Sequence, residues 1–206
     1  MKVLLINGSP HPRGCTFTAL SEVARAIQVQ GVDTQIIHTG SRVQGCIACG
    51  KCRETGECVF SGDGVNEAIG LLKNSDGLVV GAPVHYAGPA AALCAFLDRM
   101  FYGKAGAYAY KPAAAVVSCR RGGATASFDR LNKYFTISAM PVVSSTYWNE
   151  VHGNRPEEVL QDAEGLHTMR VLGTSMAWMV KAFALARQHG LPPPPIEPKI
   201  ATNFIR

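Results

Sequence analysis

The sequence has no long hydrophobic run. Its first apolar stretch, Val3 to Ile6, is too short for the hydrophobic region of a secretory signal, and turn residues follow it directly. No other stretch reaches the length that a membrane-spanning helix requires. We therefore expect a cytoplasmic protein with no membrane partner, in which the seven cysteines are thiols or ligands rather than disulfides.

Charge of one sign is not concentrated anywhere in the chain. Lysine and arginine give a formal net charge of +5 but form no run, so we expect no nucleic-acid partner and a mild attraction for anionic small molecules. The length of 206 residues suits one domain with a real core. Pro192 to Pro195 must adopt the extended polyproline II conformation. We therefore predict a domain over residues 1–190 and an extended, Pro-rich C-terminal arm over residues 191–206.

Three phosphate-handling signatures are also missing. The loop after the first apolar stretch lacks the GK[ST] ending of a P-loop and the GxGxxG pattern of a Rossmann dinucleotide site. A Cys-x5-Arg loop, which a phosphatase on a similar sheet would need, does not occur. These absences disfavour a P-loop, a Rossmann dinucleotide site and a phosphatase.

Strand and helix patterns alternate along the chain. Short apolar runs predict strands at residues 3–6, 34–38, 77–82, 113–117 and 141–145. Helical periodicity predicts helices at residues 16–30, 65–73, 90–101, 125–135 and 156–189, the last broken near Gly165. This alternation predicts an α/β fold with a doubly wound, five-stranded parallel sheet in the flavodoxin-like order 2-1-3-4-5.

The first loop, residues 8–16, follows the first strand and leads into the first helix. In such a sheet, ligands bind beyond the carboxyl ends of the strands. Successive backbone N–H groups, a helix N-terminus and two hydroxyl side chains can cradle an anion there, and Arg13 adds positive charge. The alternative is an ordinary turn in which Thr16 is the N-cap of the helix.

Four cysteines lie within thirteen residues after the second strand, at CxxCxxC spacing with a fourth further on: Cys46, Cys49, Cys52 and Cys58. Spacing this tight favours an iron–sulfur cluster over a structural zinc, which usually draws two separated pairs of ligands. The loop is expected on the same sheet edge as the anion cradle, within electron-transfer reach of a cofactor. The alternative is a loop of free thiols in a reducing compartment.

The loop after the third strand, residues 82–89, places His85 and Tyr86 between a proline and a glycine. A rigid turn of this kind can border a planar ring and offer it backbone N–H groups. The other interpretation of His85 is a general acid, although flavin chemistry often needs none.

The loop after the fourth strand, residues 118–125, contains adjacent arginines and adjacent glycines. The glycines allow the backbone to approach a ligand closely, and the arginines can face a flavin edge or the phosphate of a pyridine nucleotide. The alternative is a pair of solvated arginines.

Two further segments are interpreted differently. Asp98 and Arg99 are interpreted as a pair on the surface of a helix, and the aromatic block at residues 147–153 as packing at an interface or near the cofactor.

The segments NGSPHPRGCT and GAPVHYAGPAAALCAFLDR resemble those of the NADPH-dependent FMN reductases, which are flavodoxin-like proteins. With the four-cysteine loop added, the chain resembles the iron–sulfur flavoprotein branch of that family, from Val3 through the TNFIR ending. The resemblance implies FMN held by its phosphate on Ser9, Arg13, Gly14, Cys15 and Thr16. It implies an isoalloxazine ring on Pro83, Val84, His85, Tyr86, Ala87 and Gly88, with Ser118, Arg120, Arg121 and Gly122 closing the far side.

The resemblance also implies a [4Fe–4S] cluster on Cys46, Cys49, Cys52 and Cys58, and a homodimer or homotetramer. The chain departs from the family at Cys15, where Asn is frequent, and at His85, where Tyr is frequent. The implied activity is that of an FMN-dependent oxidoreductase with NAD(P)H as co-substrate. Hydride from NAD(P)H reduces the flavin, which passes electrons to a quinone, a flavin or another acceptor, including a redox protein. No side chain is assigned a catalytic role. The alternative is a non-enzymatic redox or thiol sensor, or an electron carrier, with bound FMN.

Overall fold

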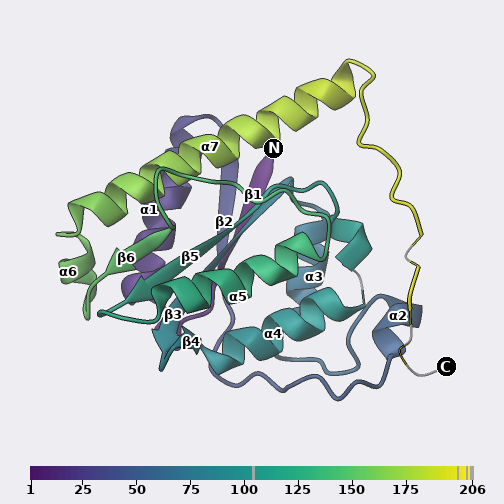
Figure 1. The fold of residues 1–206 in the computed structure, drawn as a ribbon, viewed down its shortest axis with the longest axis horizontal. Helices are drawn as coiled ribbons and strands as arrows, with labels where there is room; N and C mark the ends of the chain where they lie inside the picture. Colours follow the sequence, from purple (N-terminus) through teal and green to yellow (C-terminus); the bar gives the residue numbers. More distant parts are fainter. Residues whose placement is uncertain (104, 199, 203, 205–206) are drawn as a thin grey trace.

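A parallel β-sheet runs through the middle of the molecule, and helices cover both of its faces (Figure 1). This computed structural model describes residues 1–103, 105–198, 200–202 and 204. The strands are β1 (Lys2–Asn7), β2 (Asp33–His38), β3 (Gly77–His85), β4 (Gly88–Pro89), β5 (Ala113–Cys119) and β6 (Glu150–His152). The helices are α1 (Cys15–Val29), α2 (Lys51–Thr55), α3 (Val65–Lys73), α4 (Ala91–Tyr102), the 3-10 helix η1 (Ala105–Tyr108), α5 (Ala124–Thr136), α6 (Pro156–Val159) and α7 (Ala163–Gln188).

The sheet has the strand order β2-β1-β3-β5-β6, and every pairing along this path is parallel. The short strand β4 pairs antiparallel with the end of β3 and lies outside the path. With this hairpin strand set aside, the path is the predicted order 2-1-3-4-5. The doubly wound, flavodoxin-like α/β fold is therefore confirmed.

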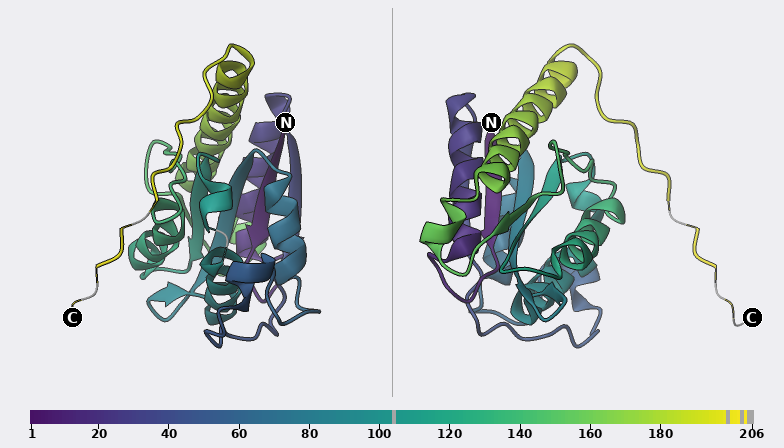
Figure 2. Two further views of the ribbon diagram at one scale, coloured as in Figure 1. Left: turned by 90° about the vertical axis from the view of Figure 1, so that its right-hand side faces the viewer. Right: turned by 60° about the vertical axis from the view of Figure 1, so that its left-hand side comes forward.

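Alternate residues of each central strand enter two separate cores. In β1, Leu4 and Ile6 pack with residues of α3, α4 and α5, whereas Val3 and Leu5 pack with residues of α1 and α7. Figure 2 shows the same division, with α1 and α7 on one side of the sheet and α4 and α5 on the other. Coverage of both faces explains why these strands are apolar at nearly every position.

The carboxyl ends of the strands meet at one edge of the sheet. Asn7 at the end of β1 pairs with Gly81 of β3 and with His38 at the end of β2. Cys119 at the end of β5 pairs with His152 at the end of β6. The loops that follow these strands therefore leave the sheet on the same side, as the doubly wound fold requires.

The predicted fifth strand at residues 141–145 is wrong. Of its two adjacent valines, Val142 and Val143, only Val142 forms a β-bridge with β5, and this bridge to Ala113 is isolated. The chain then leaves the sheet. The fifth strand of the path is Glu150–His152, three residues that carry only one apolar side chain. A strand this short and this polar has no periodicity of its own, and its register is set by its pairing with β5.

Two element boundaries also differ from the predictions. β3 continues past Ala82 to His85 and turns back as β4, so the expected loop at residues 82–89 is mostly a β-hairpin. The break in the last helix falls at residues 160–162 rather than at Gly165. The side chain of Asp162 accepts a hydrogen bond from the Gly165 backbone N–H (2.9 Å) and caps α7, so the glycine belongs to its first turn.

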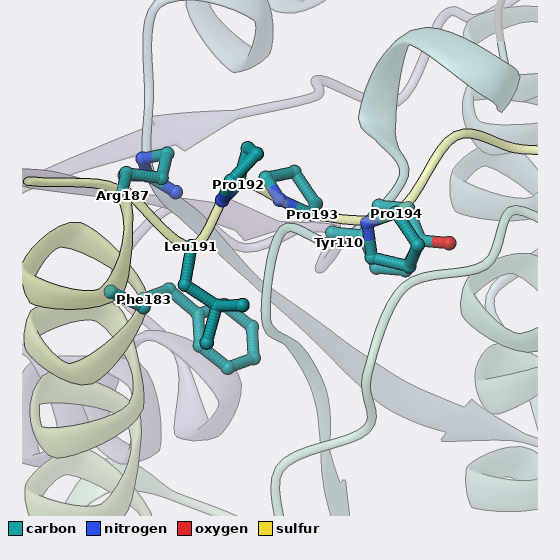
Figure 3. A pocket seen from close by; sticks show the side chains of 8 residues that line it. Tyr110, Phe183, Arg187, Leu191, Pro192, Pro193 and Pro194 are labelled. Atoms are coloured by element: carbon teal, nitrogen blue, oxygen red, sulfur yellow. The ribbon is translucent and has the colours of Figure 1, made fainter. Parts of the chain in front are cut away.

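Residues 191–198 carry neither helix nor strand and run away from the domain (Figures 1 and 2). At the base of this segment Leu191 lies against Phe183 of α7, and the following prolines lie beside Tyr110, enclosing a hollow of about 300 Å³ (Figure 3). Four positions of the predicted arm, residues 199, 203, 205 and 206, lie outside the described residues. Across the described part of the chain, no helix combines the length and hydropathy needed to cross a membrane.

Candidate functional site

A cavity of about 490 Å³ opens at the carboxyl edge of the sheet. One wall comes from the loop after β1 and the start of α1, the second from the end of β3, and the third from the end of β5 with Arg120. The fourth comes from the segment that leads from β6 into α6. We refer to it as the sheet-edge cavity; it is lined by Ser9, His11, Pro12, Arg13, Gly14, Cys15, Thr16, Pro83, Val84, His85, Ser118, Cys119, Arg120, Gly153, Asn154, Arg155 and Pro156.

The loop after β1 is held in shape by the last residue of that strand. The amide of Asn7 donates to the carbonyl of Pro12 (3.0 Å), and its oxygen accepts from the backbone N–H of Ser9 (3.1 Å). The ring of His38 also bonds the carbonyl of Ser9 (2.6 Å). Asn7 is fully buried, so the loop is attached to the core rather than lying free on the surface. This rigidity favours a preorganised binding site.

The N-terminus of α1 points into the sheet-edge cavity without a side-chain cap. Its N-cap is Gly14, which has no side chain to offer, and no acidic residue occupies the first turn. The alternative assignment of Thr16 as the N-cap is wrong: its hydroxyl lies 2.8 Å from the hydroxyl of Ser118. The first backbone N–H groups of α1 are therefore left for a ligand, and the positive end of the helix dipole favours an anion.

Three arginines line the sheet-edge cavity, namely Arg13, Arg120 and Arg155. Acidic residues on α6 also lie close to this lining: the carboxylate of Glu158 accepts from the backbone N–H of Asn154 (2.6 Å). Burial raises the pKa of the Cys15 thiol, so this side chain is a neutral thiol at pH 7. Cations, a neutral thiol and an uncapped helix thus surround a space for an anionic group.

The hairpin β3–β4 places only part of its residues in the cavity. Pro83, Val84 and His85 line it, but Tyr86 at the tip has a left-handed backbone (φ 56°) and is fully exposed. Left-handed backbone at a bulky residue is uncommon and strained. The tyrosine therefore presents its ring to the outside of this chain rather than to the cavity.

Most of the predicted cofactor-binding residues come together. The structure brings Ser9, Arg13, Gly14, Cys15, Thr16, Pro83, Val84, His85, Ser118 and Arg120 into one cavity, and places Tyr86, Ala87, Gly88, Arg121 and Gly122 outside its lining. His11, Pro12, Cys119 and Gly153 also line the cavity; they lie within predicted segments but were not named as site residues, whereas Asn154, Arg155 and Pro156 were missed altogether. The residues from Gly153 to Pro156 follow β6, and the sequence did not indicate them as a site because the fifth strand was predicted at residues 141–145 instead. The turn-forming residues Gly153 and Asn154 are the sequence signal that could have located this loop.

These residues fit a phosphate-bearing flavin. The uncapped end of α1 and Arg13 suit the phosphate, and the apolar side chains of Pro83 and Val84 suit the face of a ring. The volume of about 490 Å³ lies within the range of small-molecule sites.

The four cysteines line a second, smaller hollow together with Phe60, Arg99 and Tyr102 (the four-cysteine hollow). All four are free thiols; Cys46 and Cys49 are exposed, and Cys52 and Cys58 are half-buried. Among the described residues, no three His, Cys, Asp or Glu side chains converge tightly enough to hold one metal ion. Four soft donors around one hollow suit an iron–sulfur cluster, which spreads its ligands more widely than a single ion does. The space enclosed is only about 20 Å³, so a cluster requires the exposed side of the loop to move outward.

The four-cysteine hollow does not adjoin the sheet-edge cavity. The two share no lining residue. β4 lies beside the first residues of α4, whereas the four-cysteine hollow contacts Arg99 and Tyr102 near its other end (Figure 1). Twelve residues of α-helix span about 18 Å. The two hollows are therefore separate, and the prediction that a cluster lies within electron-transfer reach of the cofactor stays a prediction.

The interpretation of Asp98 and Arg99 as a surface pair is wrong for Arg99. Its side chain is fully buried and pairs with Asp63, not with Asp98. Asp98 is half-exposed and instead accepts a hydrogen bond from the hydroxyl of Tyr134. Burial opposes ionisation of Asp63, but the hydrogen bonds and charge of Arg99 outweigh it and hold the pKa of Asp63 below its ordinary value.

We expect Gly103→Ala to disturb the four-cysteine hollow selectively. A Cβ at Gly103 would lie 2.6 Å from the sulfur of Cys52 and 2.9 Å from its carbonyl carbon, so the backbone at Cys52 must shift. The result should be a faster alkylation of Cys52 by iodoacetamide, measured by peptide mass spectrometry. Gly45→Ala is the matched control, because a Cβ there meets nothing within 4 Å. Equal alkylation rates in both variants would show that Gly103 does not position Cys52.

Comparison with known proteins identifies close relatives. The model of the family described as NADPH-dependent FMN reductase matches residues 1–154. An iron–sulfur flavoprotein of Methanocaldococcus jannaschii is 33% identical over 195 residues, covering 88% of this chain and 98% of that protein. RosB, solved with a bound riboflavin-5'-phosphate derivative, has a TM-score of 0.68 at 13% identity and covers 100% of this chain and 94% of its own. A flavodoxin from the domain Archaea has a TM-score of 0.60 at 16% identity, over 88% of this chain and 99% of that one.

Proposed function

Because the chain belongs to the NADPH-dependent FMN reductase family, we propose that it is an FMN-dependent oxidoreductase that takes hydride from NAD(P)H and passes electrons to a quinone, a flavin or another acceptor. One structural observation supports this proposal independently of the family membership. The uncapped N-terminus of α1 meets three arginines in a preformed cavity at the switch point of the sheet. That arrangement suits an organic phosphate with a planar ring attached.

The residues of the sheet-edge cavity divide the work of binding FMN. Backbone N–H groups at Cys15 and Thr16, together with Arg13, would hold the phosphate, whereas the N–H of Gly14 already donates to the carbonyl of His11 (3.2 Å). Pro83, Val84 and His85 on one side, and Ser118 and Arg120 on the other, would hold the ring. FMN supplies the acceptance of hydride and the release of electrons, so no side chain needs to act as nucleophile or base. The contribution of the protein is to orient the ring and to set the charge around it.

The four-cysteine loop is proposed as the site of a [4Fe–4S] cluster. The position of Cys46, Cys49, Cys52 and Cys58 around one hollow supports it, as does the name of the M. jannaschii relative. A cluster would extend the activity to one-electron transfer, with a redox protein as partner.

Self-association into a homodimer or homotetramer is proposed as well. Trp178 and Leu185 on α7 are both more than half exposed, and so is Leu191, which follows the C-terminal end of that helix. Large apolar side chains exposed together favour association.

The test is an anaerobic purification followed by an absorption spectrum, an iron determination and an NAD(P)H oxidation assay on the same sample. Flavin absorbance with steady NADPH or NADH oxidation by a quinone is the expected result. Flavin without turnover would favour the alternative of a sensor or electron carrier. Failure to bind added FMN would refute the proposal.

A further inference from the structure

Arg99 lies at the base of the four-cysteine hollow with its side chain fully buried. Every nitrogen of its guanidinium has an acceptor. Nε donates to the sulfur of Cys58 (3.1 Å), and Nη1 donates to the carbonyl of Gln44 (3.1 Å). Nη2 donates to the carbonyl of Phe60 (3.2 Å), and both terminal nitrogens contact the carboxylate of Asp63.

These contacts join the two ends of the four-cysteine loop. Gln44 lies two residues before Cys46, and Phe60 lies two residues after Cys58. A single side chain from α4 therefore closes the segment that carries all four thiols. Lysine cannot reproduce this, since its ammonium is one point charge and lacks the planar fork of arginine.

The ion pair with Asp63 keeps the guanidinium in place. The side chain of Asp63 is 13% exposed, and its carboxylate holds the terminal nitrogens on the side away from Cys58. Nε is thereby directed at the sulfur. An N–H group that points at a ligand sulfur stabilises the more negative, reduced state of an iron–sulfur cluster.

We infer that Arg99 is the positioning residue of the four-cysteine site: it fixes both ends of the loop and, through its hydrogen bond to Cys58, raises the reduction potential of the cluster. The potential rests on the cluster of the proposed function, whereas the positioning of the loop does not.

The first experiment uses the metal-free protein and the variants Arg99→Lys and Asp63→Asn. Iodoacetamide alkylation of each cysteine is followed by peptide mass spectrometry. Arg99→Lys should speed the alkylation of Cys58 severalfold, because the sulfur loses its hydrogen bond and the two ends of the loop are no longer held by one side chain. Asp63→Asn retains the donor to Cys58 and should change this rate much less. Unchanged alkylation of Cys58 in Arg99→Lys would overturn the positioning role.

The second experiment uses the reconstituted protein and measures the midpoint potential of the cluster and its loss to a chelator. Arg99→Lys should lower the potential and speed the loss about 10- to 100-fold. Asp63→Asn removes a nearby negative charge and should raise the potential. Shifts of the same sign in both variants would indicate loosening of the loop and would overturn the electrostatic role.

If Arg99→Lys does not fold, the double variant Arg99→Gln/Asp63→Asn replaces it, since it removes both charges together. Its potential should lie below that of Asp63→Asn, because the two variants lack the same negative charge but only the double variant also lacks the donor to Cys58. Binding of FMN, titrated by fluorescence, reports the fold of each variant independently. A wild-type protein that takes up no iron would refute the proposed cluster, while the alkylation experiment still decides the positioning role.

Discussion

Replacement of Gly14 by aspartate is expected to lower the affinity for FMN on the order of a thousandfold. The aspartate would stand at the uncapped N-terminus of α1, where the phosphate is proposed to bind. Two unit charges about 4 Å apart repel by about 4 kcal/mol at the effective dielectric constant of a protein surface, which corresponds to about a thousandfold. The carboxylate would also accept the N–H groups that the phosphate needs. The measurement is a fluorescence titration of the flavin-free protein with FMN.

Gly14→Asn is the matched control, because asparagine has the shape of aspartate without its charge. In both variants the new Cβ would lie 3.1 Å from the Cβ of His11, so the steric cost is shared. We expect the asparagine variant to lose much less affinity, and we expect the difference between the variants to shrink as salt screens the repulsion. If both variants lose the same FMN affinity at all salt concentrations, the loss comes from the steric contact with His11 and not from the charge of the aspartate. Unchanged affinity in both would place the phosphate elsewhere.

The anion cradle is predictable from the sequence because its features are local. A short apolar strand, a run of turn residues and a helical pattern follow one another within residues 3–30, and each element has its own periodicity. The doubly wound fold then determines where the loop lies, because the carboxyl ends of parallel strands share an edge. The same reasoning correctly gathers the loops after β3 and β5.

The fourth wall of the cavity is not predictable in this way. It contains Arg155 and follows β6, a strand of three residues with one apolar side chain. The more apolar segment at residues 141–145 looks more like a strand, yet it makes only one bridge to the sheet. Tertiary pairing with β5 decides between the two segments, and no local pattern reports it.

Arg99 is missed for a related reason. Its neighbour Asp98 suggests a local pair on a helix surface, but the true partner, Asp63, is 36 residues away. Charged residues are rarely buried unless paired, and a long-range partner cannot be identified from one sequence. The cysteine spacing indicates what the loop contains; it does not indicate which helix supports it.

Arg99→Met is expected to destabilise the protein by about 3–5 kcal/mol, the usual cost of removing one partner from a buried ion pair. Three effects combine in this cost. The carboxylate of Asp63 loses its counter-charge, and the carbonyls of Gln44 and Phe60 lose their donors. The measurement is urea unfolding of the metal-free protein at pH 7. A loss below about 1 kcal/mol, as for a surface ion pair, would contradict the burial of Arg99.

The double variant Arg99→Met/Asp63→Asn separates charge from packing. Because it removes both charges, it should be more stable than Arg99→Met alone, although it still lacks the donors to the two carbonyls.

The pH dependence of stability gives an independent check on Asp63. The pKa of Asp63 is lower in the folded than in the unfolded protein. Its contribution to the free energy of unfolding is therefore complete above the unfolded pKa of about 3.9, and it is lost as the pH falls through the pKa of the folded protein. The stability advantage of the wild type over Asp63→Asn should therefore be full at pH 7 and shrink in acid. An advantage that grows on acidification would mean that Asp63 is not held ionised by Arg99.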